Sequence, residues 1–179
     1  MDDNDLLEKI KNKETRNYGF NLLVRKYQQK VYYHIRRMVI DHDETDDLVQ
    51  DTFIKVYNNI HKFRADAQLF TWIYRIATNT CLNHLNKKKR RLIFSLTNLD
   101  HEMAAKLESA PYITGDEIQL KLQKALLTLP PKQRLVFNMK YYDDMKYDKI
   151  AEITGTSTGA LKASYHHAVK KIEEYLKKH

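Results

Sequence analysis

Between Gly19 and Pro111 the chain contains no glycine and no proline. Nothing in this half of the sequence therefore breaks a helix or supplies a tight hairpin turn. Apolar residues recur at spacings of three and four instead of alternating, which is the pattern of amphipathic helices and not of strands. The sequence predicts an all-α protein.

Charge divides the chain into three segments. Residues 1–91 carry 18 Lys and Arg against 12 Asp and Glu, residues 92–117 carry 1 against 5, and residues 118–179 carry 12 against 6. The middle segment also loses helical periodicity and contains Ser, Thr, Asn, Pro and Gly, as linkers do. We expect two small helical domains, at 1–91 and 118–179, joined by a flexible acidic linker. The basic surface favours a polyanionic partner, although a merely solvated surface carries the same charge.

Several classes of protein are excluded. The single cysteine, Cys81, cannot form an internal disulfide or, by itself, a structural zinc site. No apolar run approaches the roughly 20 residues of a membrane span, and the acidic start at 1–3 is unlike a signal peptide. The HExxH, CxxC and glycine-rich phosphate motifs are absent. We expect a cytoplasmic protein that does not insert into membranes, with no catalytic residues, no metal and no cofactor.

In the first domain, periodicity predicts helices at 20–40, at about 47–60 and at 69–85. Clustered carboxylates at 41–47 favour the start of the second helix through capping and the macrodipole. The same region forms an acidic row that suits a basic protein partner and not DNA. A solvated helix start explains this row equally well. The row consists of Asp46, Asp47, Gln50 and Asp51.

Aromatic residues mix with cations in the loop at 63–68 and in the helix that follows. Aromatic faces stack on unpaired bases, cations track the backbone, and an amide can read a base edge. An aromatic stripe at helical spacing is, however, more often core. Periodicity alone leaves Trp72, Tyr74 and Asn79 undecided between these roles.

Residues 147–162 fit a helix-turn-helix in the second domain. Gly155 can take the left-handed turn, while Leu161 and Tyr165 pack the second helix on the first. Such a helix enters a major groove, with cations on phosphates and short polar side chains at base edges. An ordinary helical hairpin is the plainer alternative. The outward positions are Ser157, Thr158, Ala160, Lys162, Ala163, His166, His167 and Lys170.

Taken in order, these segments resemble the extracytoplasmic-function (ECF) sigma factors, the smallest promoter-recognition subunits of bacterial RNA polymerase. The resemblance implies a non-enzymatic factor that binds core polymerase and directs promoter-specific initiation. The matching stretches are 20–27, 46–57, 63–64, 70–79, 129–134 and the helix-turn-helix.

The resemblance also implies partners and residue roles. The acidic row would dock on the clamp helices of the polymerase β′ subunit, and the β flap is a second expected contact. The outward positions of the helix-turn-helix would read the −35 duplex, together with Lys132 and Arg134. An anti-sigma factor, often membrane-bound in this family, is the expected inhibitor. Opening and reading of the −10 element would fall to Lys55, Phe63, Arg64, Asp66, Trp72, Tyr74, Arg75 and Asn79.

The recognition helix departs from the family pattern. That pattern reads Gly-Thr-Val-Lys-Ser-Arg with further arginines, whereas Ser164 stands here where an arginine is common. We therefore expect a variant −35 element. Two alternatives remain: a free-standing helix-turn-helix repressor or activator, and a nucleic-acid enzyme such as a recombinase or nuclease. A simple repressor needs neither the acidic row nor the aromatic helix, and an enzyme would need a metal or nucleophile cluster.

Overall fold

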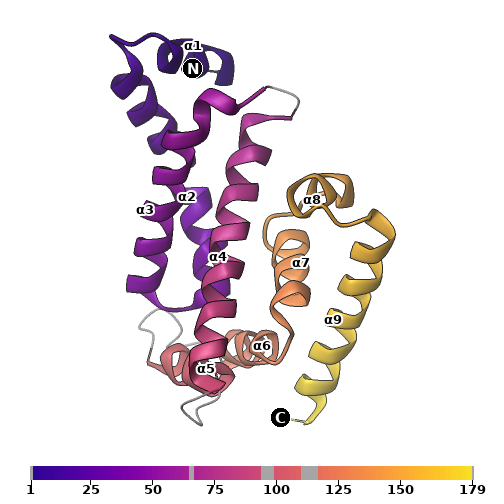
Figure 1. The fold of residues 1–179 in the computed structure, drawn as a ribbon. Helices are drawn as coiled ribbons and strands as arrows, with labels where there is room; N and C mark the ends of the chain where they lie inside the picture. Colours follow the sequence, from indigo (N-terminus) through magenta and orange to yellow (C-terminus); the bar gives the residue numbers. More distant parts are fainter. Residues whose placement is uncertain (1, 65–66, 94–98, 110–116, 179) are drawn as a thin grey trace.

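The computed structural model describes residues 2–64, 67–93, 99–109 and 117–178, which form nine α-helices, one 3-10 helix and no strand (Figure 1). The predicted all-helical class with two domains is confirmed. A short helix, α5 (Leu99–Glu108), lies between the domains. The first domain contains α1 (Asp3–Lys11), α2 (Arg16–Val39), α3 (His42–Asn59), η1 (Ile60–Lys62) and α4 (Leu69–Ile93). The second contains α6 (Glu117–Leu127), α7 (Pro131–Tyr141), α8 (Tyr147–Thr154) and α9 (Thr158–Lys178). No helix in the described part of the chain is long and apolar enough to cross a membrane.

The N-terminal segment is more ordered than the sequence predicts. Helix α1 is a separate element with an Asp2–Asp5 capping box at its start, and it buries Leu6 and Ile10. Helix α2 begins at Arg16, four residues before the predicted start. Gly19 therefore lies inside α2 and does not break the helix. Because it has no side chain, α1 can lie directly against α2 at this position.

We expect Gly19→Ala to lower the free energy of unfolding by about 1–3 kcal/mol. A Cβ at this position would lie 2.8 Å from the Lys9 Cβ and 3.0 Å from the Ile10 backbone nitrogen, so α1 would have to shift. Helix propensity alone would favour alanine by about 0.5–1 kcal/mol. Gly159→Ala is the matched control, because a Cβ there meets nothing within 4 Å. Urea unfolding measures both, and a stabilised Gly19→Ala variant would contradict the packing argument.

The expectation of a linker without helical structure is wrong at residues 92–93, 99–108 and 117, all of which are helical. Helix α4 continues to Ile93, and residues 99–108 form α5. Helix α5 buries Met103 and Leu107, which are four residues apart and therefore share a face. In the sequence only Leu99, Met103 and Leu107 follow this spacing, a pattern too short for periodicity to stand out among acidic neighbours.

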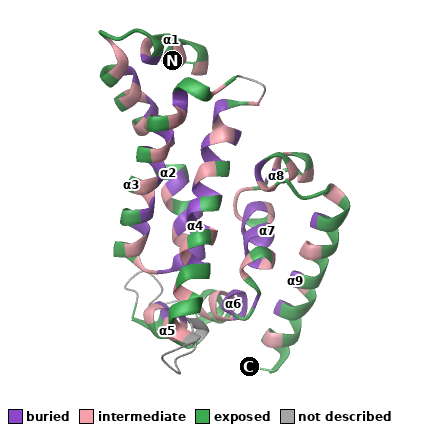
Figure 2. Ribbon diagram, in the orientation of Figure 1, coloured by how far each residue is buried: buried purple, intermediate pink, exposed green. Residues whose placement is uncertain are grey.

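Most buried side chains form one large cluster that continues from the first domain into the second (Figure 2). It joins Val31 and Ile73 of the first domain to Met139 and Ile150 of the second. The domains contact each other where α2 meets α7 and where α4 meets α8. A smaller cluster lies within the second domain, among α6, α7 and α9. The two domains therefore share the larger core in this structure, and the second domain has a smaller core of its own.

Candidate polymerase and nucleic-acid interfaces

The predicted docking residues lie together on the outer side of α3. Asp41 caps this helix by accepting a hydrogen bond from the Glu44 backbone N–H at 2.8 Å. The carboxylates that follow therefore fall in the first turns of a helix, where the macrodipole favours negative charge. Three members of the row are exposed and the fourth is half-buried: Asp46, Asp47, Gln50 and then Asp51.

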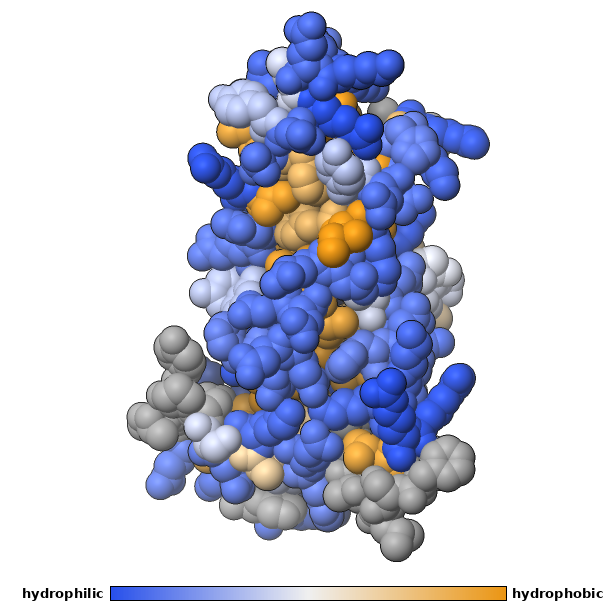
Figure 3. All heavy atoms as spheres, turned by 60° about the vertical axis from the view of Figure 1, so that its left-hand side comes forward, coloured by the Kyte–Doolittle hydropathy of each residue, from blue (hydrophilic) through white to orange (hydrophobic). Residues whose placement is uncertain are grey.

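The same side of α3 carries an exposed apolar residue that the sequence analysis did not select. Ile54 is 59% exposed and lies one turn after Gln50. Figure 3 brings the α3 side forward and shows apolar surface among hydrophilic atoms. A single exposed isoleucine is ordinary, but beside an acidic row it offers a protein partner apolar contact as well as charge. The sequence signal for this residue is its spacing: Ile54 follows Gln50 by four positions and so shares a helix face with the acidic row.

The predicted −10 residues on the surface share one face of α4. Trp72, Arg75 and Asn79 are spaced by three and four residues; Arg75 and Asn79 are exposed, and Trp72 is half-buried. The Trp72 ring lies 5.4 Å from the ring of Phe63, and Arg64, which follows Phe63 in the chain, is exposed. Aromatic rings next to cations are the combination that binds single-stranded nucleic acid.

Tyr74 differs from the prediction, because the structure places it in the core. Its side chain is 2% exposed, and its hydroxyl donates a hydrogen bond to the Lys30 carbonyl at 3.1 Å. The ring lies 4.3 Å from that of Phe70 and 4.7 Å from that of His34. In this arrangement Tyr74 packs between α4 and α2 and does not reach DNA. Asp66, also predicted for this site, lies outside the described residues.

Lys55 links the two predicted sites of the first domain. Its ammonium group lies 2.7 Å from the Asp51 carboxylate on the docking face and 3.1 Å from the Thr80 hydroxyl on α4. Half-exposed pairs of this kind contribute only about 0.2–0.5 kcal/mol. Lys55 can therefore exchange Asp51 for a phosphate at little cost.

The helix-turn-helix has the predicted geometry. Gly155 adopts the left-handed conformation, with φ 70°, between α8 and α9. The Ser157 hydroxyl accepts a hydrogen bond from the Ala160 backbone N–H at 3.3 Å, and Leu161 is 1% exposed against the core. Among the predicted outward residues, Thr158 is half-buried and the others are exposed: Ser157, Ala160, Lys162, Ala163, His166, His167 and Lys170.

Arg134 is buried and does not lie on the DNA-facing surface that the sequence predicts for it. Lys132 is exposed, but Arg134 is 2% exposed, as part of a buried run that extends to Met139. Helix α7 packs on α9 and α8 and also on α2 of the first domain, so little of its surface is left for DNA. Arg134 is therefore a core residue in this arrangement.

A polar cluster lies where α2 meets the segment after α7. The Arg37 guanidinium donates a hydrogen bond to the Asp143 carboxylate at 2.5 Å, and the His34 ring nitrogen lies 4.0 Å from the same group. Burial, with the nearby Arg37 charge, lowers the pKa of His34 to about 4, so the ring is neutral at neutral pH. The Arg37–Asp143 pair is thus the ionic contact of this cluster, and it joins the two domains.

A second set of contacts joins α8 to α4. The Lys149 ammonium lies 3.0 Å from the Gln68 amide oxygen and 3.0 Å from the Thr71 hydroxyl, and Arg75 donates to the Glu152 backbone carbonyl. Gln68, Arg75, Lys149 and Glu152 border a cavity of about 960 Å³, which Phe63 and residues 69–70 also line. Arg75, predicted to contact DNA, is therefore engaged by the second domain here. Lys149 was not selected from the sequence, because its spacing gives no hint of a partner 78 residues away.

Two family descriptions match this chain: Sigma-70 region 2 over residues 23–91 and Sigma-70 region 4 over residues 119–172. The RNA polymerase sigma-H factor of Pseudomonas aeruginosa is 32% identical, over 97% of this chain and 93% of its own length. The ECF RNA polymerase sigma-E factor of Escherichia coli K12 is 30% identical, over the same shares. The chain belongs to the sigma-70 family of transcription initiation factors, in its ECF class.

Solved structures support the fold. The sigma factor RpoE of Bartonella quintana, in complex with the anti-sigma factor NepR, superposes with a TM-score of 0.69 at 22% identity, covering 88% of this chain and 96% of its own. CnrH in complex with the cytosolic domain of CnrY gives a TM-score of 0.68 at 22% identity, covering 98% and 97%. The predicted resemblance is confirmed, and the chain is a promoter-recognition sigma factor for RNA polymerase and not an enzyme.

Proposed function

We propose that the two domains divide promoter recognition among three surfaces. The outer side of α3 docks on core polymerase, the exposed face of α4 opens and holds the −10 element, and α9 reads the −35 duplex. The observation that carries this division is the separation of chemistry within the first domain. The acidic row with Ile54 occupies α3, while Trp72, Arg75 and Asn79 share a face of α4.

The −10 surface supplies the free energy of strand opening through binding alone. Stacking of a base on an aromatic side chain contributes about 1–3 kcal/mol, comparable to the cost of unstacking a base pair step. Phe63 and Trp72 provide the aromatic surface, and Arg64 and Arg75 neutralise phosphates. Asn79 offers both a donor and an acceptor to a base edge.

The −35 surface is built for close approach by α9. Ala160 and Ala163 are exposed near its start, where apolar contact with a thymine methyl group is available. His166, His167 and Lys170 follow in the next turns. We therefore propose a −35 element that differs from the one read by arginine-bearing relatives.

An anti-sigma factor is the proposed inhibitor of this chain, in the cytoplasm, where core polymerase works. Two sigma factors of similar fold were solved with anti-sigma proteins bound. The shared arrangement of two helical domains supports the same mode of inhibition here.

Run-off transcription tests the function directly. Core polymerase with this chain, on a library of genomic fragments, should give discrete transcripts that core polymerase alone does not give. If no promoter-specific transcript forms, the proposed division of promoter recognition among the three surfaces fails.

A further inference from the structure

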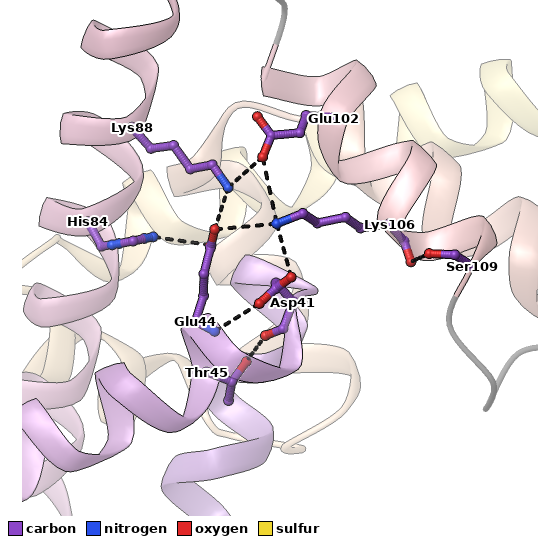
Figure 4. Close-up of polar contacts among 8 residues, drawn as sticks. All are labelled: Asp41, Glu44, Thr45, His84, Lys88, Glu102, Lys106 and Ser109. Atoms are coloured by element: carbon purple, nitrogen blue, oxygen red, sulfur yellow. Dashed lines mark hydrogen bonds and ion pairs between the residues drawn. The ribbon is translucent and has the colours of Figure 1, made fainter.

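Helix α5 is attached to the first domain by a network of charged side chains (Figure 4). The Lys106 ammonium lies 2.9 Å from the Asp41 carboxylate and 3.5 Å from that of Glu44. Lys88 of α4 lies 2.6 Å from Glu44 and 3.0 Å from Glu102 of α5. Glu44 also accepts from His84 at 3.2 Å. The network therefore connects the start of α3 and the end of α4 to Glu102 and Lys106, which lie one turn apart on α5.

The network is charged at neutral pH. Burial acts to raise the pKa of Glu44, but hydrogen bonds from Lys88 and His84 hold this pKa below its usual value. The hydrogen bond to Asp41 raises the pKa of Lys106, so both ends of that contact keep their charge. Side chains in the network are between 15% and 34% exposed. A connected, partly screened network of this kind holds a helix more firmly than an isolated surface pair does.

Helix α5 also contacts the second domain. Met103 and Leu107 are 1% and 2% exposed within the buried cluster that spans both domains, and α5 packs chiefly on α6. Lys124 of α6 also pairs with Glu108 at 2.6 Å. Helix α5 is thus bonded to both domains at once, at the end of the molecule away from α8 (Figure 1).

The arrangement in which α2 contacts α7 and α4 contacts α8 is called the closed form. In the closed form the two domains cannot reach both promoter elements at once. The −35 and −10 elements lie about 25 base pairs apart, or about 85 Å along straight DNA. A folded chain of 179 residues has a radius of gyration of only about 16 Å. Allowing a radius of about 15 Å for each domain leaves a gap of about 55 Å for the connection to bridge.

Only a released α5 makes the connection long enough. With α5 held on the first domain, the eight residues 109–116 reach about 28 Å at most, and with α5 held on the second, the five residues 94–98 reach about 17 Å. With α5 helical but free of both domains, the segment 94–116 reaches about 60 Å. Both attachments must therefore open before the two domains reach their elements.

We propose that α5 is a latch, whose ionic attachment to the first domain holds the two domains closed and must release for promoter engagement. This inference rests on the proposed assignment of α4 to the −10 element and α9 to the −35 element. The docking side of α3 remains exposed in the closed form. Polymerase can therefore bind before the latch opens, and the closed form limits DNA binding by the free factor.

Alkylation of Cys81 measures latch opening in the full-length protein. This cysteine, the only one in the chain, is 1% exposed and belongs to the buried cluster that the two domains share. Separation of the domains divides this cluster, so the alkylation rate follows the open fraction. We expect Lys106→Glu to raise the rate about tenfold, since the new carboxylate faces Asp41 and Glu44.

Lys121→Glu is the matched control, because it makes the same change of charge at an exposed position of α6. It should alkylate at the wild-type rate. Urea unfolding of each variant separates domain opening from global unfolding. The proposal is overturned if Lys106→Glu alkylates like the wild type, or if its rate rises only in step with a fall in unfolding free energy. Glu102→Lys replaces the α5 carboxylate with an ammonium group that repels Lys88 and Lys106. This variant should release the same latch independently.

Run-off transcription distinguishes failure of the latch from failure of the proposed function. With core polymerase, the Lys106→Glu variant should initiate at least as well as the wild type, because the bound form is already open. If neither protein initiates, the function is wrong whatever the alkylation shows. If both initiate and alkylation is unchanged, the function stands and the latch does not.

Discussion

Asp47→Arg should weaken binding to core polymerase by about 10- to 100-fold, which corresponds to about 1.4–2.8 kcal/mol. Asp47 is exposed in the middle of the acidic row on α3. Reversing its charge places a cation against the basic partner surface that the row is proposed to meet, so attraction becomes repulsion. Titration of labelled core polymerase measures the affinity, and promoter transcription should fall in parallel at limiting factor concentration.

Glu174→Arg is the control for this change. It alters the net charge by the same amount at an exposed position of α9, away from α3. Core affinity of this variant should stay close to that of the wild type. Equal losses in the two variants would assign the effect to overall charge, and an unchanged Asp47→Arg variant would remove α3 as the docking surface.

The helices of the first domain followed from the sequence because their apolar stripes are long. The stripe from Leu48 to Ile60 and the one from Leu69 to Leu85 each extend over several turns, and α3 and α4 lie there. Helix α5 does not stand out in the sequence, because its apolar spacing is limited to Leu99, Met103 and Leu107. Periodicity needs several turns to rise above chance, and short helices gain their stability from contacts that the local sequence does not show.

Individual site residues were harder to assign than helices, because burial depends on how many neighbours surround a helix. Helix α4 contacts α2, α3 and α8, so its buried arc is wider than one amphipathic stripe and includes Tyr74. Asn79, five residues later, stays exposed. Arg134 follows the same rule, since α7 is enclosed by α9 and by α2 of the other domain. Contacts between domains are set by tertiary packing, and no local pattern predicts them.

Asn79→Ala should lower the yield of open complexes by about tenfold or more while leaving core binding unchanged. The amide is exposed on the same face of α4 as Trp72 and Arg75, and loss of a good base contact costs about 1–3 kcal/mol. Because the side chain is exposed, truncation leaves no cavity in the core. Permanganate reactivity of unpaired thymines in the −10 region measures opening, and core titration measures docking.

Asn86→Ala separates base reading from a general effect of alanine on α4. Asn86 is exposed on the same helix, two turns after Asn79, and the change raises helix propensity equally. Its open-complex yield should match the wild type. Together with Asp47→Arg, which should spare melting once the factor is saturating, Asn79→Ala would resolve docking and strand opening onto α3 and α4. If Asn79→Ala opened DNA normally, the base-reading role would have to move to Trp72 and the neighbouring cations.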